Sequence, residues 1–516
     1  MGNSNNTNNY SSKRILKNTL FLYVRQIVTL IVSLYTSRVI LDILGVDDYG
    51  IYNVIAGFIV LLSLINNSMT SATQRFISYE LGHGDKQQVS RTFSMSMTAH
   101  ILVCVLVLVL GETIGLWYVY NGLVVPEDRA FAAHWVYQIS LLSVFVTIIR
   151  SPYQASTIAY EKMDAFSIIS ILEVVLKLVI VYLLALFSYD KLILYAILLL
   201  LSNLLITGVY KIYCSHKFDT CNYSYFMEAS YFKKLLSFLG WNVLGASSTM
   251  GTQQAGSLII NRYVGVAINA AYGIANQVSS AVSSFVTNFQ MAFTPQIVKL
   301  YATGERTTMF TLMFRSSVLS FYLLFFIVTP ILLNIDYVLS LWLKEVPPYT
   351  GVFCIWVFGC SFIDSLQAPL SIAINASGTI KKYYIWQSSL WLLTIPAIIL
   401  CFHFEMSLAW VVIVRFIVGI ICSIVRTIQA QSITGMPISQ YLKSVILRVL
   451  MVVLICIPLY IKMNEFLHVD SIIKLFLFYC LSFIISGAVV LFLGISNKDR
   501  ALVFSYVRRL IYKNKQ

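Results

Sequence analysis

The stretch "LGVDDYGIYN" (Leu44–Asn53) returns in outline much later in the chain as "VGVAINAAYGIAN" (Val264–Asn276). Each Tyr-Gly pair is followed by an apolar segment of similar length. Each segment then ends in a glycine, an acidic residue and a basic residue, Gly84-Asp85-Lys86 in the first copy and Gly304-Glu305-Arg306 in the second. A shared order of residues over about forty positions indicates a duplicated half.

The composition places both halves in a membrane. Hydrophobic residues make up 58% of the 516 residues and charged residues 11%, whereas a globular chain carries about 25% charged residues. Long windows such as Val174–Phe187 and Leu475–Leu493 run apolar, and a bilayer-spanning helix needs roughly 20 such residues. The sequence therefore predicts an all-α polytopic membrane protein with about 14 transmembrane helices.

The hydrophobic windows also predict how these helices are grouped. We expect two pseudo-symmetric six-helix lobes and two extra C-terminal helices. The helices are expected near 15–43, 51–79, 92–120, 131–155, 165–187, 190–213, 231–261, 270–297, 307–333, 350–374, 382–402, 407–428, 441–462 and 471–494. The chain then divides into a disordered cytoplasmic leader (1–14), an N-terminal lobe (15–213), a C-terminal lobe (231–428), helices 13–14 (441–494) and a basic cytoplasmic tail (495–516).

The net charge of +14 is distributed as a topology signal. If the N-terminus is cytoplasmic, alternate connections carry most of the Lys and Arg residues, as the positive-inside rule requires. This asymmetry predicts an even number of helices with both termini in the cytoplasm. It also excludes nucleic acid as the partner that the basic charge would otherwise suggest.

Several classes of protein lack their sequence signatures. The chain has no phosphate-binding loop, no HExxH and no nucleophile elbow, and none of its nine cysteines forms a CxxC pair. The longest connections, around 214–230 and 334–349, are too short for a soluble catalytic domain. We therefore expect a non-enzymatic protein without a metal or cofactor. One feature favours an enzyme: Asp47-Asp48, in the first outside loop, could serve a membrane glycosyltransferase or polymerase, or form only a solvated connection.

Polar residues recur on one face of several predicted spans. In the eighth helix the spacing alternates between three and four, which puts them on a single face. That face comprises Asn276, Ser280, Ser283, Thr287, Gln290 and Thr294. Similar faces occur in the first helix (Asn18, Arg25, Thr29, Ser33, Thr36) and the seventh (Asn242, Gly245, Thr249, Gln253, Gly256).

Polar faces on corresponding helices of two halves predict a central cavity where the halves meet. Close packing of helices through small residues is the alternative explanation. Long polar side chains, which packing does not require, favour the cavity. The candidate substrate-binding residues are Arg25, Thr29, Asn67, Gln253, Asn276, Thr287 and Gln290.

Charges deep in the spans are informative because each costs roughly 2.5–3.5 kcal/mol at a helix centre. Arg25 has no carboxylate one turn away and could present its planar fork to a phosphate, or pair with an acid on another helix. Glu173 and Lys177 are one turn apart and could neutralise each other or respond to protons. Asp364 lies just before Pro369, a candidate hinge, and Arg415 is its candidate partner. These last four residues are the candidates for ion coupling or gating.

The chain resembles the polysaccharide flippases of the multidrug/oligosaccharidyl-lipid/polysaccharide exporter superfamily. The resemblance lies in "NTLFLYVRQIVTLIVSLYTSRVILDILGVDDYGIYNVI", where Arg38, Leu44-Gly45 and Tyr49-Gly50 match the opening pattern of that family. It implies two six-helix lobes around a central cavity and a flippase in the bacterial inner membrane. The cargo would be undecaprenyl-pyrophosphate-linked repeat units of capsule, exopolysaccharide or lipopolysaccharide, moved to the periplasmic leaflet by alternating access.

The resemblance also implies roles and partners. Arg25 would contact the pyrophosphate and the polar faces the sugar hydroxyls, while Asp364 or Glu173 would couple transport to an ion. Whether a proton, sodium or neither is used stays open. Membrane lipids, glycosyltransferases and a polysaccharide polymerase are the other expected partners. A cation-coupled multidrug exporter of the same superfamily, a lipid-II flippase and the membrane glycosyltransferase or polymerase remain as alternatives.

Overall fold

The computed structural model describes residues 3–121, 127–187, 189–226, 228–264, 266–343, 346–496 and 500–501, with side chains described at only some positions before residue 65. Every regular element in these ranges is helical. Ten segments are long and apolar enough to cross a membrane: Lys86–Gly115, Ala130–Ala159, Met163–Leu186, Lys191–Lys217, Arg306–Leu333, Thr350–Ser377, Lys381–His403, Trp410–Thr434, Ile438–Leu467 and Ile472–Gly494. The fold class is thus all-α and polytopic, while the count of about 14 remains a prediction.

The first helix, α1 (Asn3–His83), contains two expected spans. Its backbone leaves helical geometry at Gly45, where φ is 78° and ψ is 172°. A side chain rarely tolerates this positive φ, so glycine allows the chain to break here between the expected helices 15–43 and 51–79. Residues 3–14 are also helical and belong to α1, although we expected them to form a disordered leader.

The glycine–acid–base triplets of the repeat form similar connections. Gly84 and Gly304 both have positive φ, 82° and 77°, and a new helix begins two residues after each, at Lys86 and Arg306. In the first copy Asp85 caps α2 (Lys86–Leu110), because its carboxylate accepts the Gln87 and Gln88 N–H groups at 2.9 and 3.1 Å. The repeated letters therefore encode a helix stop followed by a helix start.

The chain divides into two compact units, whose limits differ from those of the predicted lobes. Unit 1 comprises Met1–Ser247 and Met291–Glu305, and unit 2 comprises Ser248–Gln290 and Arg306–Gln516. The helices α7 (Ala229–Tyr263) and α8 (Val266–Ala302) each contribute to both units. The boundaries 15–213 and 231–428 for the lobes remain a prediction from the repeat, and most of the basic tail 495–516 lies outside the described residues.

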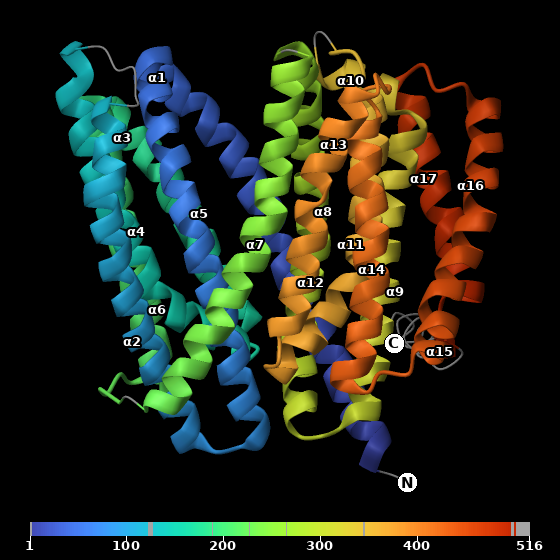
Figure 1. The fold of residues 1–516 in the computed structure, drawn as a ribbon, viewed down its shortest axis with the longest axis horizontal. Coiled ribbons are helices and arrows are strands. Elements are labelled where there is room, and N and C mark those ends of the chain that lie inside the picture. Colours follow the sequence, from blue (N-terminus) through green and yellow to red (C-terminus); the bar gives the residue numbers. More distant parts are fainter. Residues whose placement is uncertain are drawn as a thin grey trace, which may run out of the picture. The chain divides into compact units, whose positions relative to one another are not determined.

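Unit 1 is built around four long helices that lie side by side (Figure 1). They are α2, α4 (Ala130–Ala159), α5 (Met163–Leu186) and α6 (Lys191–Lys217), joined to α1 and to the short elements η1 (Gly111–Gly115), α3 (Leu116–Asn121), η2 (Glu127–Arg129) and η3 (Asp219–Cys221). Their core includes Leu22, Phe93 and Met163, all fully buried. Because these side chains come from α1, α2 and α5, their burial ties the helices into one unit.

Unit 2 contains the remaining helices. They are α9 (Arg306–Leu333), α10 (Ile335–Trp342), α11 (Thr350–Ser377), α12 (Lys381–Leu392), α13 (Thr394–His403), α14 (Trp410–Thr434), α15 (Ile438–Tyr441), η4 (Leu442–Ile446), α16 (Leu447–Leu467), α17 (Ile472–Val489) and η5 (Val490–Gly494). Two departures from expectation occur. The connection after α9 contains the unpredicted α10, held by buried Ile335 and Leu339. The expected helix 382–402 is interrupted at Leu393, because Pro396 cannot donate a backbone hydrogen bond to Leu392.

Candidate functional site

Glu173, at the centre of α5 in unit 1, lies close to several basic side chains. Glu173 accepts a hydrogen bond from Lys177, one turn later, with a Nζ–Oε1 distance of 3.3 Å. This confirms the local pair predicted from their spacing. Glu173 also accepts from Arg150 of α4 at 3.3 Å, a partner that the sequence analysis missed. Arg150 is 8% exposed, so its charge depends on this carboxylate for compensation.

Arg25 lies near the same carboxylate. Its guanidinium stacks over the Phe166 ring at 4.8 Å and interacts electrostatically with Glu173 and Tyr210. The sequence could not show this neighbour, because Glu173 lies on α5 rather than one turn away on α1. Arg25, Arg150 and Lys177 thus surround one acidic group, and we call these four residues the unit 1 cluster. Within this cluster three cations accompany one carboxylate.

The other two candidates in unit 1 occupy different settings. Thr29 is half-buried in α1, whereas the Asn67 side chain is exposed. The neighbouring Asn66 is the residue that packs, because its Oδ1 accepts the Ser151 hydroxyl of α4 at 2.7 Å. Part of the polar interruption in the second expected helix (51–79) is therefore a contact between α1 and α4, made by Asn66 and Ser151.

Unit 2 brings three predicted residues into one hydrogen-bonded network. Gln253 of α7 donates to Asn276 Oδ1 of α8 at 3.1 Å, and Arg415 of α14 reaches the same oxygen at 3.4 Å. Arg415 also donates to the Tyr272 hydroxyl at 3.1 Å. The spacing of polar residues predicted Gln253 and Asn276 on the polar faces of their own helices, but not that they contact each other. It gave no sign that an arginine from α14 would join them.

The suggested partnership of Asp364 and Arg415 needs correction. Among the described side chains no ion pair joins them, since Arg415 instead binds Tyr272 and Asn276. Arg415 and Arg426 both act on Asp364 electrostatically, and they lie about three turns apart on one face of α14. The Asp364 side chain is exposed. Asp364, Arg415 and Arg426 form what we call the unit 2 cluster, in which two arginines accompany one carboxylate.

Some side chains on the polar face of α8 bind other helices, and others are exposed. Gln290 donates to the Ser320 hydroxyl at 3.3 Å and to the Ser365 carbonyl at 3.4 Å, which joins α8 to α9 and α11. Thr287 is exposed, with its hydroxyl donated to the Ser283 carbonyl. Gln277 and Ser280 are exposed as well. Exposed polar groups on a membrane helix avoid lipid, so this part of α8 is suited to water or a polar ligand.

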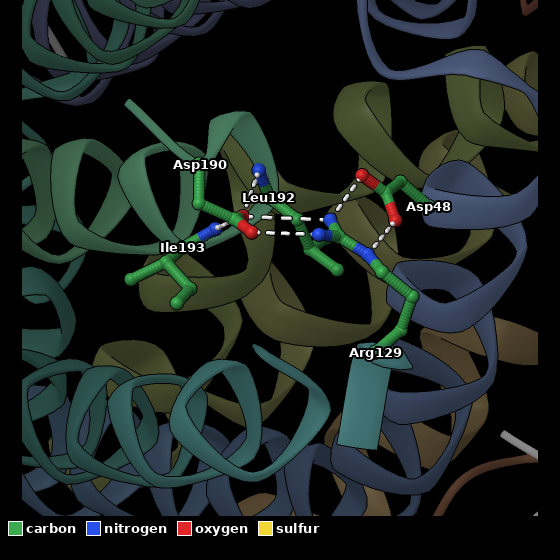
Figure 2. A network of polar contacts seen from close by, with 5 residues as sticks. All are labelled: Asp48, Arg129, Asp190, Leu192 and Ile193. Atoms are coloured by element: carbon green, nitrogen blue, oxygen red, sulfur yellow. Dashed lines mark hydrogen bonds and ion pairs between the residues drawn. The ribbon is translucent and has the colours of Figure 1, made fainter. Parts of the chain in front are cut away.

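Asp48, the described member of the Asp47-Asp48 pair, belongs to an ionic network at the ends of three helices (Figure 2). Arg129 Nε donates to Asp48 Oδ1 at 2.8 Å, and Arg129 Nη2 forms a second bond to Asp48. Arg129 Nη1 donates to Asp190 Oδ2 at 2.7 Å, and Asp190 caps α6 by accepting the Leu192 and Ile193 N–H groups. Asp47 lies outside the described side chains.

Electrostatics favour the charged form of Asp190 in this network. Burial raises the pKa of Asp190, but the Ile193 N–H and the Arg129 guanidinium outweigh it and hold the pKa below its ordinary value. A carboxylate with a lowered pKa stabilises the fold above its unfolded pKa, and the contribution is lost as the pH falls through the folded pKa. The network therefore has a structural role that needs no catalysis.

Two variants separate this structural role from a catalytic one. Arg129→Ala should lower the free energy of unfolding by about 1–2 kcal/mol, because two carboxylates lose a bidentate partner. Asp48→Asn should cost less, because Asp190 still binds Arg129. Thermal unfolding of the purified protein would measure both. A loss of activity in Asp48→Asn without any change in stability would contradict the structural role.

The fold can now be compared with solved structures. An outward-facing multidrug resistance MATE family transporter of the MOP superfamily matches with a TM-score of 0.69 at 14% identity, over 82% of this chain and 96% of that one. A MOP superfamily transporter from Pyrococcus furiosus, described as having a binding pocket of reverse polarity, matches with a TM-score of 0.65 at 14% identity, over 81% and 96%. The MATE transporter ClbM in complex with Rb+ matches with a TM-score of 0.66 at 13% identity, over 80% and 94%. The chain therefore shares the fold of these three transporters.

Comparison of the sequence with family models gives a more specific assignment to a protein family than the fold does. A search of curated proteins found no match. The family model described as "Polysaccharide biosynthesis protein" matches residues 15–301, more than half of the chain. This chain belongs to the polysaccharide biosynthesis protein family.

Proposed function

We propose that this protein is a flippase for undecaprenyl-pyrophosphate-linked oligosaccharides, acting by alternating access. The observation that carries the proposal is the charge balance within the membrane helices. The unit 1 cluster has three cations for one carboxylate, and the unit 2 cluster has two arginines for one carboxylate. Cations that outnumber their acidic partners favour a negatively charged cargo.

The chemistry of a lipid-linked pyrophosphate fits these groups. The head group cannot cross hydrocarbon unaided, so it requires cations for the pyrophosphate and hydrogen-bonding groups for the sugars. Arg25 supplies a planar fork for phosphate oxygens. Gln277, Ser280 and Thr287 offer exposed amide and hydroxyl groups to sugars. The lipid tail can remain in the bilayer while the head group moves.

The charge balance of the two clusters disfavours a multidrug exporter, because a site that binds a cationic drug would need more carboxylates than cations. The enzyme alternative is weakened by Asp48, which is already held by Arg129 through two bonds. For orientation, the positive-inside distribution supports cytoplasmic termini. We place the protein in the bacterial inner membrane, with transport toward the periplasmic leaflet and glycosyltransferases and a polymerase as its partners in the pathway.

A reconstituted assay tests the function. Purified protein in proteoliposomes would receive either a fluorescent undecaprenyl-pyrophosphate oligosaccharide or a cationic dye, with and without a proton or sodium gradient. A membrane-impermeant quencher reports exchange between the leaflets. We expect exchange of the oligosaccharide lipid above that of protein-free vesicles, and no transport of the dye. Gradient-driven movement of the dye alone would identify a multidrug exporter instead.

A further inference from the structure

The end of α8 belongs to a different unit from the rest of that helix. Residues 266–290 of α8 lie in unit 2, whereas Met291–Ala302 lie in unit 1. Pro295 lies inside the helix, and its missing N–H leaves the carbonyl of Met291 without the usual helical hydrogen bond. The backbone hydrogen bonding of α8 is therefore interrupted close to the point where the helix passes from unit 2 to unit 1.

An ion pair holds this end of α8 within unit 1. Glu161, in the turn between α4 and α5, accepts from Lys299 Nζ at 2.7 Å and from Gln296 Nε2 at 3.2 Å. The Glu161 side chain is only 4% exposed. A carboxylate buried to this extent requires a charged partner, because leaving it unpaired would be strongly unfavourable.

Glu161 also has an unusual backbone conformation. Its φ is 59°, and the turn closes with Glu161 N–H bonded to the Ile158 carbonyl and Lys162 N–H bonded to the Thr157 carbonyl. This pattern ends a helix with a left-handed residue that is usually glycine. A glutamate at this position is strained relative to glycine, and its side chain forms the ion pair with Lys299.

The last turns of α8 also pack closely on α1. A Cβ added to Gly82 would lie 2.8 Å from the Ala302 Cβ and 3.0 Å from the Lys299 carbonyl oxygen, so the two helices approach as closely as glycine permits. Ile297 is fully buried, and Ala292 belongs to the core of unit 1. This end of α8 is thus fastened by both packing and charge.

We propose that Glu161, Gln296 and Lys299 form a latch that holds the end of α8 on α1 and the α4–α5 turn in one transport state and releases it in the other. Release would expose the Glu161 carboxylate and Lys299 to water, where each charge is solvated separately. The proposal rests on the transport function, but its test needs no cargo and can therefore fail or succeed independently of the flippase assignment.

Protection of a buried thiol from chemical labelling reports whether the latch is closed. Ile297→Cys places a thiol on the buried side of the last turns of α8, and N-ethylmaleimide labels it only when those turns separate from the rest of unit 1. Mass spectrometry of the individual peptide distinguishes this thiol from the nine native cysteines. Leu324→Cys, fully buried in α9 of unit 2, is the matched control site. Each thiol would be labelled in the full-length protein with the latch intact and with it altered.

We expect Lys299→Met and Glu161→Gln each to accelerate labelling of the thiol at 297 about tenfold, because a buried charge or its partner is lost. Labelling at 324 should stay unchanged. Glu161→Gly should release the latch equally while removing the backbone strain, which separates the role of the carboxylate from damage to the turn. The exchanged pair Glu161→Lys with Lys299→Glu should restore protection.

Three results would overturn the proposal. Labelling at 297 could be unaffected by loss of either charge. It could rise equally at 297 and 324, which would indicate general loosening of the fold. Protection could also fail to return in the exchanged pair although the protein remains folded by thermal unfolding. Each result would show that the ion pair does not control the position of the end of α8.

Discussion

Arg25→Ala is expected to slow flipping of the pyrophosphate-linked oligosaccharide about ten- to a hundredfold. Hydrogen bonds to charged groups contribute about 1.5–3 kcal/mol, and every 1.4 kcal/mol corresponds to roughly a tenfold change. The Arg25 guanidinium lies against Phe166 at 4.8 Å and belongs to a cluster that already has more cations than carboxylates. We expect the planar Arg25 guanidinium to bind a phosphate oxygen pair of the substrate.

Leaflet exchange in proteoliposomes is the measurement for this prediction. Arg25→Lys keeps the charge but loses the planar fork, so it should retain part of the rate. Arg262→Ala, at the exposed last turn of α7, is the matched control and should transport normally. If exchange survives in Arg25→Ala, the flippase function stands and Arg25 is removed from the substrate site. Arg415 would then be the next residue to test.

Glu173→Gln is expected to lower the free energy of unfolding by about 3 kcal/mol, the lower end of the cost of breaking a buried ion pair by removing one partner, because the Glu173 side chain is 24% exposed. Arg150, only 8% exposed, would lose its carboxylate while Lys177 and Arg25 remain nearby. The unit 1 cluster would then lose its carboxylate while its three cations remain. This makes it the largest stability effect that we expect from a single substitution.

Thermal unfolding in detergent would show the loss as a lower midpoint. The matched control is Asp470→Asn, which removes the carboxylate from an exposed one-turn pair with Lys474 and should leave the midpoint unchanged. A second variant, Arg150→Met combined with Glu173→Leu, should recover much of the stability, because apolar replacement of a buried pair is often neutral. An unchanged midpoint in Glu173→Gln would show that water or lipid head groups solvate Arg150.

Patterns that depend on neighbours along one helix were readable from the sequence. The pairing of Glu173 with Lys177 follows from their one-turn spacing. The breaks at Gly45 and Gly84 follow from the backbone freedom of glycine. The spacing placed Asn276 and Gln290 on one polar face of the eighth helix, and both bind side chains of other helices. Their role in binding substrate remains a prediction.

Contacts between segments that are far apart in the chain could not be predicted from residue spacing. Nothing in the spacing of residues links Arg129 to Asp48 and Asp190, or Arg415 to Asn276, because each pair meets only after several helices have packed. The pairing suggested for Asp364 and Arg415 failed for this reason, although the two residues do lie within electrostatic reach. The only available signal was a general one: a charge in an apolar span needs compensation from somewhere.

The sequence by itself determined the membrane environment, the helical class, the repeat and the positions of its turns, since hydrophobicity and glycine act locally. The tertiary structure decided which charges compensate each other. It joined Arg150 to Glu173 and Lys299 to Glu161. The physical reason is that Coulombic interactions depend on distance in space, which for helices far apart in the chain is set only by packing.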